Sequence, residues 1–152
     1  MKRLRQLREL TAAERRVLIH AILLVAAVRL CLWLMPFDTF RRSWATILVR
    51  VARSKQPEGL PPRKIVWLVA VASRCVPQAH CLTRSVAAQM LLARQGDLAR
   101  MKIGVRKHGD SLDAHAWLEY EGVALSESEV HLSRFTALTA ISPWPEASHA
   151  AQ

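Results

Sequence analysis

Two residues in the second half of the chain are of types that together perform nucleophilic catalysis. Cys81 begins the helix-like segment CLTRSVAAQMLLARQ. A thiol at a helix N-terminus lies beside unpaired backbone N–H groups and the positive end of the helix dipole, which favour the thiolate. His115 follows 34 residues later in an apolar, strand-like segment. A strand packed beside the helix start would bring this imidazole to the thiol as a general base.

Each of the two residues also has a structural interpretation. A cysteine at a helix start is often a small buried hydrophobe, and a histidine beside Trp117 can be a core residue with satisfied hydrogen bonds. Their order is nevertheless informative. Cysteine, then histidine, then a carboxylate or amide on the next strand is the order of papain-like and transglutaminase-like enzymes, in which the third group orients the imidazole.

The N-terminal elements begin with a long apolar helix. Thr11 and Glu14 have the spacing of a capping box ahead of the apolar residues 17–35. This stretch is long enough to span a membrane, but it contains His20 and Arg29. An arginine near the middle of a span costs about 2.5–3.5 kcal/mol. We therefore expect a long buried amphipathic helix in a soluble domain.

A second helix and a break follow. Pro36 ends the first helix, and residues 37–55 have the pattern of a basic amphipathic helix. Its expected apolar face consists of Phe40, Trp44, Ile47, Leu48 and Val51. Residues 56–63 form a Pro/Gly-rich break, and residues 1–10 fit either a short amphipathic helix or a frayed terminus.

The pattern changes from helical to strand-like in the second half. Residues 63–77 predict a helix stopped by Pro77, and the helix that begins at or just before Cys81 ends at Gly96, a C-cap residue type. Strands are predicted over residues 101–107, 115–121 and 122–127. Helices followed by a small meander indicate an α+β fold.

The run from residue 80 to 127 resembles the peptidase half of the B proteins of lasso peptide biosynthesis, a transglutaminase-like cysteine protease family. The matching motifs are a Cys-Leu-x-x-Ser helix start at 81–85, an Ile-Gly-Val strand at 103–105, and an Ala-His-Ala-Trp strand with a Glu-x-x-Gly turn at 114–122. The resemblance covers about residues 60–130. More loosely, the Thr-x-x-Glu-Arg start and the apolar run resemble stand-alone members of the family.

The resemblance implies roles for individual residues. Cys81 would be the nucleophile and His115 the general base. The third member in the family is usually an aspartate about a dozen residues after the histidine, where this chain has Glu127, one methylene longer. Glu129 and Asp113 are the other candidates for that role.

We also expect roles for three residues near Cys81 and His115. Arg84 and Ser85 would either flank the thiol or serve as a solvated or helix-packing pair. Trp117 shares a strand face with His115, where it would exclude water from the ion pair or belong to the core.

The implied fold is a helical layer followed by a papain-like or transglutaminase-like core. The implied reaction is hydrolysis of one peptide bond that frees a ribosomally made core peptide from its leader. Backbone N–H groups at the start of the Cys81 helix would stabilise the oxyanion, and no metal or cofactor is needed. A stand-alone peptidase would act with a separate leader-recognition protein and pass its product to a macrolactam-forming cyclase.

Composition and charge limit the other possibilities. The 152 residues are 51% hydrophobic and 22% charged, which excludes a disordered chain. Residues 1–63 hold 13 basic and 4 acidic side chains, whereas residues 64–152 hold 9 and 8. Nearly all of the net charge of +10 thus lies in residues 1–63, and we expect it to mark a layer that faces a partner or a membrane surface, rather than nucleic acid. The absence of a convincing signal sequence predicts a cytoplasmic protein, peripheral at most at the inner face of the membrane.

The expected organisation is a basic helical region over residues 1–56, a peptidase core over 57–141 and a loose tail over 142–152. Two alternatives to the peptidase stay open: a transglutaminase-like acyl transferase with an amine acceptor, and a non-enzymatic basic adaptor for a membrane or nucleic acid. A metal site built from Cys75, His80, Cys81 and His115 would need unusual ligand spacing.

Overall fold

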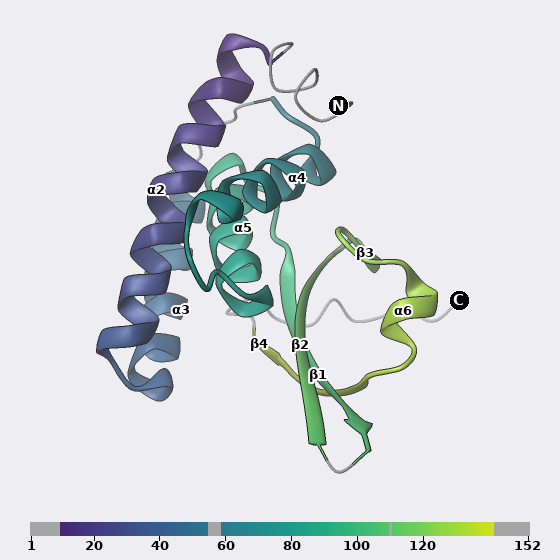
Figure 1. Ribbon diagram of the computed structural model, residues 1–152. Helices are drawn as coiled ribbons and strands as arrows, with labels where there is room; N and C mark the ends of the chain where they lie inside the picture. Colours follow the sequence, from purple (N-terminus) through teal and green to yellow (C-terminus); the bar gives the residue numbers. More distant parts are fainter. Residues whose placement is uncertain (1–9, 55–58, 110, 142–152) are drawn as a thin grey trace.

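The computed structural model describes residues 10–54, 59–109 and 111–141. Within these residues, four helices precede a four-stranded antiparallel sheet, and α5 lies between the other helices and the sheet (Figure 1). The fold is α+β, as the sequence predicted. The short helix expected within residues 1–10 and the tail at 142–152 fall almost wholly outside the described residues.

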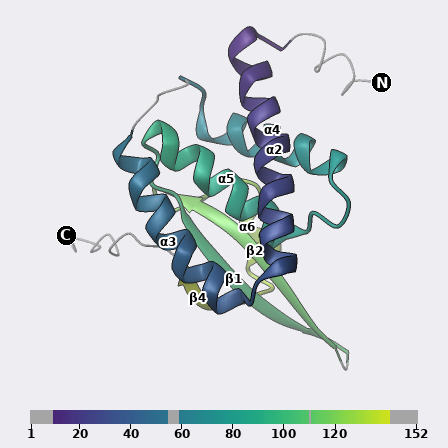
Figure 2. The same cartoon turned by 90° about the vertical axis from the view of Figure 1, so that its left-hand side faces the viewer.

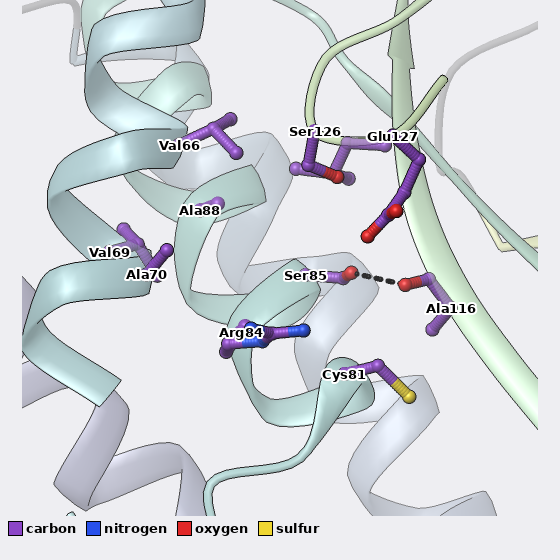
Figure 3. Close-up of a pocket in the computed structure, with 11 residues that line it drawn as sticks. Val66, Val69, Ala70, Cys81, Arg84, Ser85, Ala88, Ala116, Ser126 and Glu127 are labelled. Carbon is purple, nitrogen blue, oxygen red and sulfur yellow. Dashed lines mark hydrogen bonds between the residues drawn. The ribbon is translucent and has the colours of Figure 1, made fainter. Parts of the chain in front are cut away.

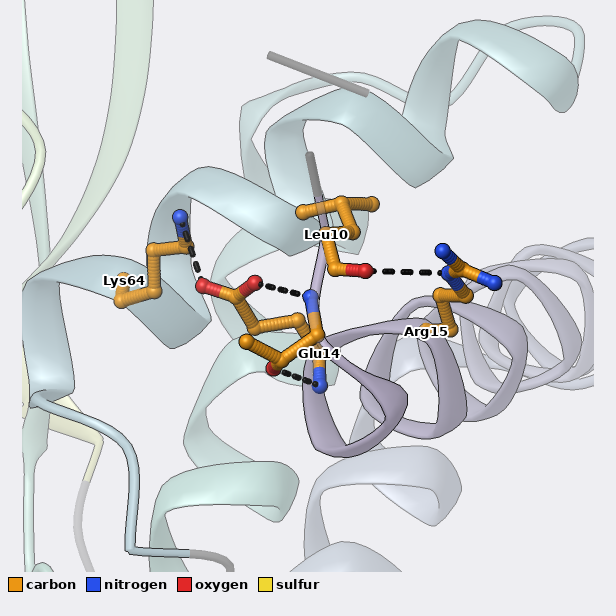
Figure 4. Close-up of polar contacts among 5 residues, drawn as sticks. Leu10, Glu14, Arg15 and Lys64 are labelled. Carbon is orange, nitrogen blue, oxygen red and sulfur yellow. Dashed lines mark hydrogen bonds and ion pairs between the residues drawn. The ribbon is translucent and has the colours of Figure 1, made fainter. Parts of the chain in front are cut away.

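The first helix, α2 (Ala12–Leu34), begins at the predicted capping box. The Thr11 hydroxyl accepts a hydrogen bond from the Glu14 N–H at 3.2 Å, and the Glu14 carboxylate accepts one from the Thr11 N–H at 2.8 Å. The same carboxylate pairs with Lys64 Nζ at 2.8 Å (Figure 4). Because Lys64 lies in the first turn of α4, this ion pair joins the starts of the two helices.

The two faces of α2 have different surroundings. Its buried face, formed by Val17, Ala21, Val25 and Val28, packs against α4 and α5. The opposite face is exposed and apolar, so the expected buried helix is buried on one side only. The helix is long and apolar enough to cross a membrane, although those two properties are shared by many core helices.

The second helix, α3 (Phe37–Arg53), packs Phe40, Trp44 and Leu48 against the domain. Ile47 was expected on this face but is 44% exposed, because its position falls at the edge of the buried stripe. The Trp44 indole N–H donates to the Gln89 side-chain oxygen at 3.3 Å, and the Gln89 amide donates to the Ala99 carbonyl at 3.1 Å. Buried Gln89 thus links α3 to the turn that precedes the sheet.

The next two helices start and end close to the residues that the sequence predicted. Helix α4 (Pro62–Ala72) continues into a 3-10 turn, Ser73–Cys75. Helix α5 (Cys81–Gln95) begins at Cys81 and ends at Gly96, whose φ of 100° is the left-handed C-cap conformation that glycine adopts without strain.

The sheet has the strand order β3-β2-β1-β4. Its elements are β1 (Arg100–His108), β2 (Ser111–Tyr120), β3 (Val123–Ala124), a single helical turn α6 (Glu129–Leu132) and β4 (Thr136–Ile141). The strand expected over 122–127 is only two residues long, since the chain turns away as a loop after Ala124. The sequence also gave no sign of α6 or β4, which pairs with β1 at the far edge.

Candidate active site

Cys81 lies where helix α5 meets strand β2. It is the first residue of α5, preceded by His80 in an extended conformation, and its side chain is half-buried. The thiol donates to the Ala114 carbonyl of β2 at 4.0 Å. Cys81 thus belongs to the first turn of the helix, whose backbone N–H groups have no intrahelical acceptor, and Figure 3 shows its sulfur pointing toward β2.

Ser85 repeats this contact one helical turn later. Its buried hydroxyl donates to the Ala116 carbonyl at 3.0 Å (Figure 3). Four residues of an α-helix rise about 6 Å, and two residues of a strand advance about 6.8 Å. Because these lengths are similar, two side chains one turn apart on α5 can each reach a carbonyl on the same side of β2. Ser85 therefore packs α5 on β2, and it also lines the pocket beside Cys81 together with Arg84.

A cavity of about 120 Å³ adjoins the thiol. Its walls come from α4, α5, β2 and the loop after β3. The lining residues are Val66, Val69, Ala70, Cys81, Arg84, Ser85, Ala88, Ala116, Leu118, Ser126 and Glu127. The pocket is apolar toward α4 and polar toward the loop, so it suits an apolar side chain joined to a polar backbone.

His115 lies on the other face of β2. Side chains alternate along a strand, and Ala116 and Leu118 face the pocket while His115 and Trp117 face away from it. The imidazole stacks on the Trp117 ring with centroids 6.3 Å apart and packs on Phe135 at 5.3 Å. Within the described residues, the thiol thus bonds to the Ala114 carbonyl rather than to the imidazole.

Glu127 connects the two sides. Its side chain lines the pocket with Cys81, and its Oε1 lies 3.5 Å from His115 Nε2. That nitrogen is buried and has no hydrogen-bond partner among the described residues, so its contact with the carboxylate is electrostatic at this distance. Hydrogen bonds of catalytic groups are commonly long without substrate and shorten in the complex.

The surroundings of His115 determine its protonation state. Burial lowers the pKa of the imidazole below its usual value of 6.5, and the charges of His131 and Arg84 lower this pKa further, whereas Glu127 raises it. The net shift is downward. The imidazole is therefore neutral near pH 7, which is the state in which it accepts a proton.

A family model, the transglutaminase-like superfamily, matches residues 21–140. The chain belongs to this superfamily. Its members are in general cysteine-dependent enzymes, which fits a cysteine at a helix start facing a small antiparallel sheet. Searches of curated proteins and of solved structures gave no match.

Contacts within the sheet hold the Trp117 ring against the His115 ring. The Trp117 indole N–H donates to Glu119 at 3.0 Å, and Glu119 pairs with Lys102 on β1 at 2.7 Å. Opposite His115 in the register is Gly104, where a Cβ would lie 3.0 Å from the Trp117 ring. The glycine is needed because the indole occupies that space.

The other candidate carboxylates are placed differently. Asp113 pairs with Arg106 across the β1–β2 hairpin at 2.8 Å. The backbone of Glu129 begins α6, and its side chain lies outside the described part of the structure. Glu127 is therefore the candidate carboxylate that the described side chains bring to His115.

Sequence reasoning missed His131 as a neighbour of the site. Its ring meets the His115 ring edge-on at 5.8 Å. Ligand atoms of His115, Glu127 and His131 lie within 4.8 Å of one another, so these three could be drawn together around a divalent ion. Cys75 and His80, considered above as metal ligands, do not join that group in the described residues. A lone histidine in a polar loop carries no pattern that would reveal this placement.

Proposed function

We propose that the protein is a cysteine peptidase that cleaves the leader from a ribosomally synthesised lasso-type precursor peptide. The observation that carries the proposal is the position of Glu127, which lies both in the pocket of Cys81 and beside His115. The motif resemblance over about residues 60–130 supports the substrate class.

Cys81 attacks the scissile carbonyl as the thiolate, forming a carbon–sulfur bond. The oxyanion accepts hydrogen bonds from backbone N–H groups at the start of α5. His115 takes up the thiol proton and gives it to the leaving amine as the C–N bond breaks, and Glu127 holds the ring. Water, deprotonated by His115, then hydrolyses the thioester and restores the thiol. Substrate binding must first bring Nε2 or Nδ1 of His115 to the thiol.

Two partners belong to the proposal. A separate recognition protein presents the leader, as the resemblance to stand-alone members of the family implies. A macrolactam-forming cyclase then uses the new amino terminus. No nucleic acid takes part.

The test is cleavage of a precursor peptide with its recognition protein, followed by mass spectrometry. Cys81→Ala and His115→Ala should lower the cleavage rate by at least about 10²-fold. Cys31→Ala and Cys75→Ala, which alter the other two thiols, are matched controls that should cleave at the wild-type rate. Normal cleavage by folded Cys81→Ala would refute the mechanism. Products joined to an added amine, rather than hydrolysed, would identify the acyl transferase instead.

A further inference from the structure

The exposed face of α2 is apolar along most of the helix. Its large side chains are between 53% and 73% exposed, namely Ile19, Leu23, Leu30, Trp33 and Leu34. Ala26 and Ala27 fill the gap between Leu23 and Leu30. Spacings of three, four and seven residues place these positions in one stripe, called here the α2 stripe. In Figure 2, α2 lies in front of α4 and α5, and the exposed fractions of these side chains show that no described element covers the stripe.

This stripe is unusual for the surface of a soluble monomer. Single exposed apolar residues are common, but a continuous row marks a surface that binds something. Removing one large side chain from water contributes about 1.5–3 kcal/mol, so five of them on one helix would give substantial binding. Every exposed residue of α2 from Ile19 to Leu34 is apolar.

The charges beside the stripe indicate what binds there. Arg15 and Arg16 are exposed just before it, and Arg41 and Arg42 are exposed on α3 just after the turn that follows it. Trp33 is 73% exposed within the stripe, and tryptophan is a residue type enriched at membrane–water interfaces. An apolar row with arginines near both ends is complementary to an anionic lipid surface.

We propose that the α2 stripe inserts into the interface of an anionic bilayer, with the helix axis parallel to the membrane plane. The helix does not span the bilayer, because its other face holds Val17, Ala21 and Val25 in the core of the domain. Arg29, in the middle of the apolar stretch, is also bound to the Gln78 side chain.

The active-site pocket stays on the aqueous side in this orientation. Helices α4 and α5 lie between α2 and the sheet, and the pocket is lined from α4, α5 and β2 (Figure 1). A membrane-bound molecule would thus present Cys81 to a soluble substrate. The membrane contact does not depend on the proposed peptidase activity, and its test needs no substrate.

The experiment measures co-sedimentation of the full chain with vesicles in 0.1 M NaCl. We expect binding to vesicles of equal phosphatidylcholine and phosphatidylglycerol that exceeds binding to pure phosphatidylcholine by at least about tenfold. The double variant Leu23→Lys/Leu30→Lys should bind the anionic vesicles at least tenfold more weakly. The matched control is Leu112→Lys, since Leu112 is 74% exposed on the sheet hairpin, and this variant should bind like the wild type.

A second measurement does not depend on the folding of the double variant. Brominated lipids should quench tryptophan emission in the wild type more strongly than in Trp33→Phe, because Trp33 would lie at headgroup depth. Equal quenching in the two proteins would overturn the proposal. Resistance to extraction from the membrane at alkaline pH would also overturn it, because that result indicates a spanning helix. A stable dimer that forms through the stripe and does not bind vesicles would overturn it as well.

Discussion

At the scale of single residues, the charges around His115 make its titration a test of the site. Burial, His131 and Arg84 lower the pKa of the imidazole, and Glu127 opposes them. Protonation removes the base, so the acid limb of kcat/KM that follows His115 should lie below pH 6.5. Glu127→Gln should move this pKa further down, because Glu127 is the one of these charged groups that attracts the proton. Arg84→Gln should move the pKa up, because it removes a repulsion.

Direct titration of the His115 ring by NMR measures these shifts, with His115→Gln identifying the resonance. His131 titrates in the same cluster, so its resonance must be followed in the same spectra. Shifts of the His115 pKa in the same direction for Glu127→Gln and Arg84→Gln would show that at least one of the two charges does not act on the imidazole.

The length of the Glu127 side chain suits its place in the chain. Glu127 lies in the loop that follows the two-residue strand β3, and its carboxylate oxygen is 3.5 Å from His115 Nε2. An aspartate on the same backbone would be shorter by one C–C bond of about 1.5 Å. With the loop in this position, an aspartate would therefore lie farther from the imidazole than Glu127 does.

At the scale of the elements, Gly104 decides how β1 accommodates the site. A Cβ there would lie 3.0 Å from the Trp117 ring and 3.1 Å from the Phe135 Cβ, and both rings pack on His115. We expect Gly104→Ala to lower the free energy of unfolding by about 1–3 kcal/mol, because this space is already filled. The displaced Trp117 should also change the near-ultraviolet circular dichroism and lower the activity.

Urea unfolding, near-ultraviolet spectra and activity together check this expectation. Gly109→Ala is the matched control, since a Cβ at Gly109 meets open space although the backbone φ is +61°. It should cost some stability through the positive φ while the Trp117 signal stays unchanged. A Gly104→Ala protein with wild-type stability and spectrum would show that the indole does not fill this space.

At the scale of the whole molecule, features that depend on neighbouring residues were predictable from the sequence, whereas contacts between distant segments were not. The Thr11–Glu14 capping box, the start of α5 at Cys81 and the cap at Gly96 were all predictable, because each depends on neighbouring residues along the chain. The approach of Glu127 to His115 and the added β4 depend on contacts between distant segments, which periodicity does not encode.

The exposure of the α2 stripe illustrates the same limit. A uniformly apolar helix looks the same in sequence whether one face or both faces are covered. Only the packing of α4 and α5 on one side shows that the other side is bare. His131 went unnoticed for a related reason, because α6 places it beside His115 through tertiary structure alone.

The core joins the helical layer to the sheet. Val25 of α2 and Leu48 of α3 belong to the same buried cluster as Leu92 of α5 and Leu118 of β2. We therefore predict that residues 57–152 alone will not fold, since removal of α2 and α3 exposes one side of α4 and α5 to water. Circular dichroism and amide dispersion in NMR spectra measure this directly.

A complementation experiment shows whether residues 57–152 fail to fold because the buried faces of α2 and α3 are missing, or for another reason. Adding residues 1–54 as a separate peptide should restore dispersed spectra and thermal unfolding, because the buried faces of α2 and α3 would again cover α4 and α5. The same peptide with Val25→Asp, which puts a charge on the buried face, should not restore them. If residues 57–152 fold cooperatively alone, the helical layer is an accessory to an independent core.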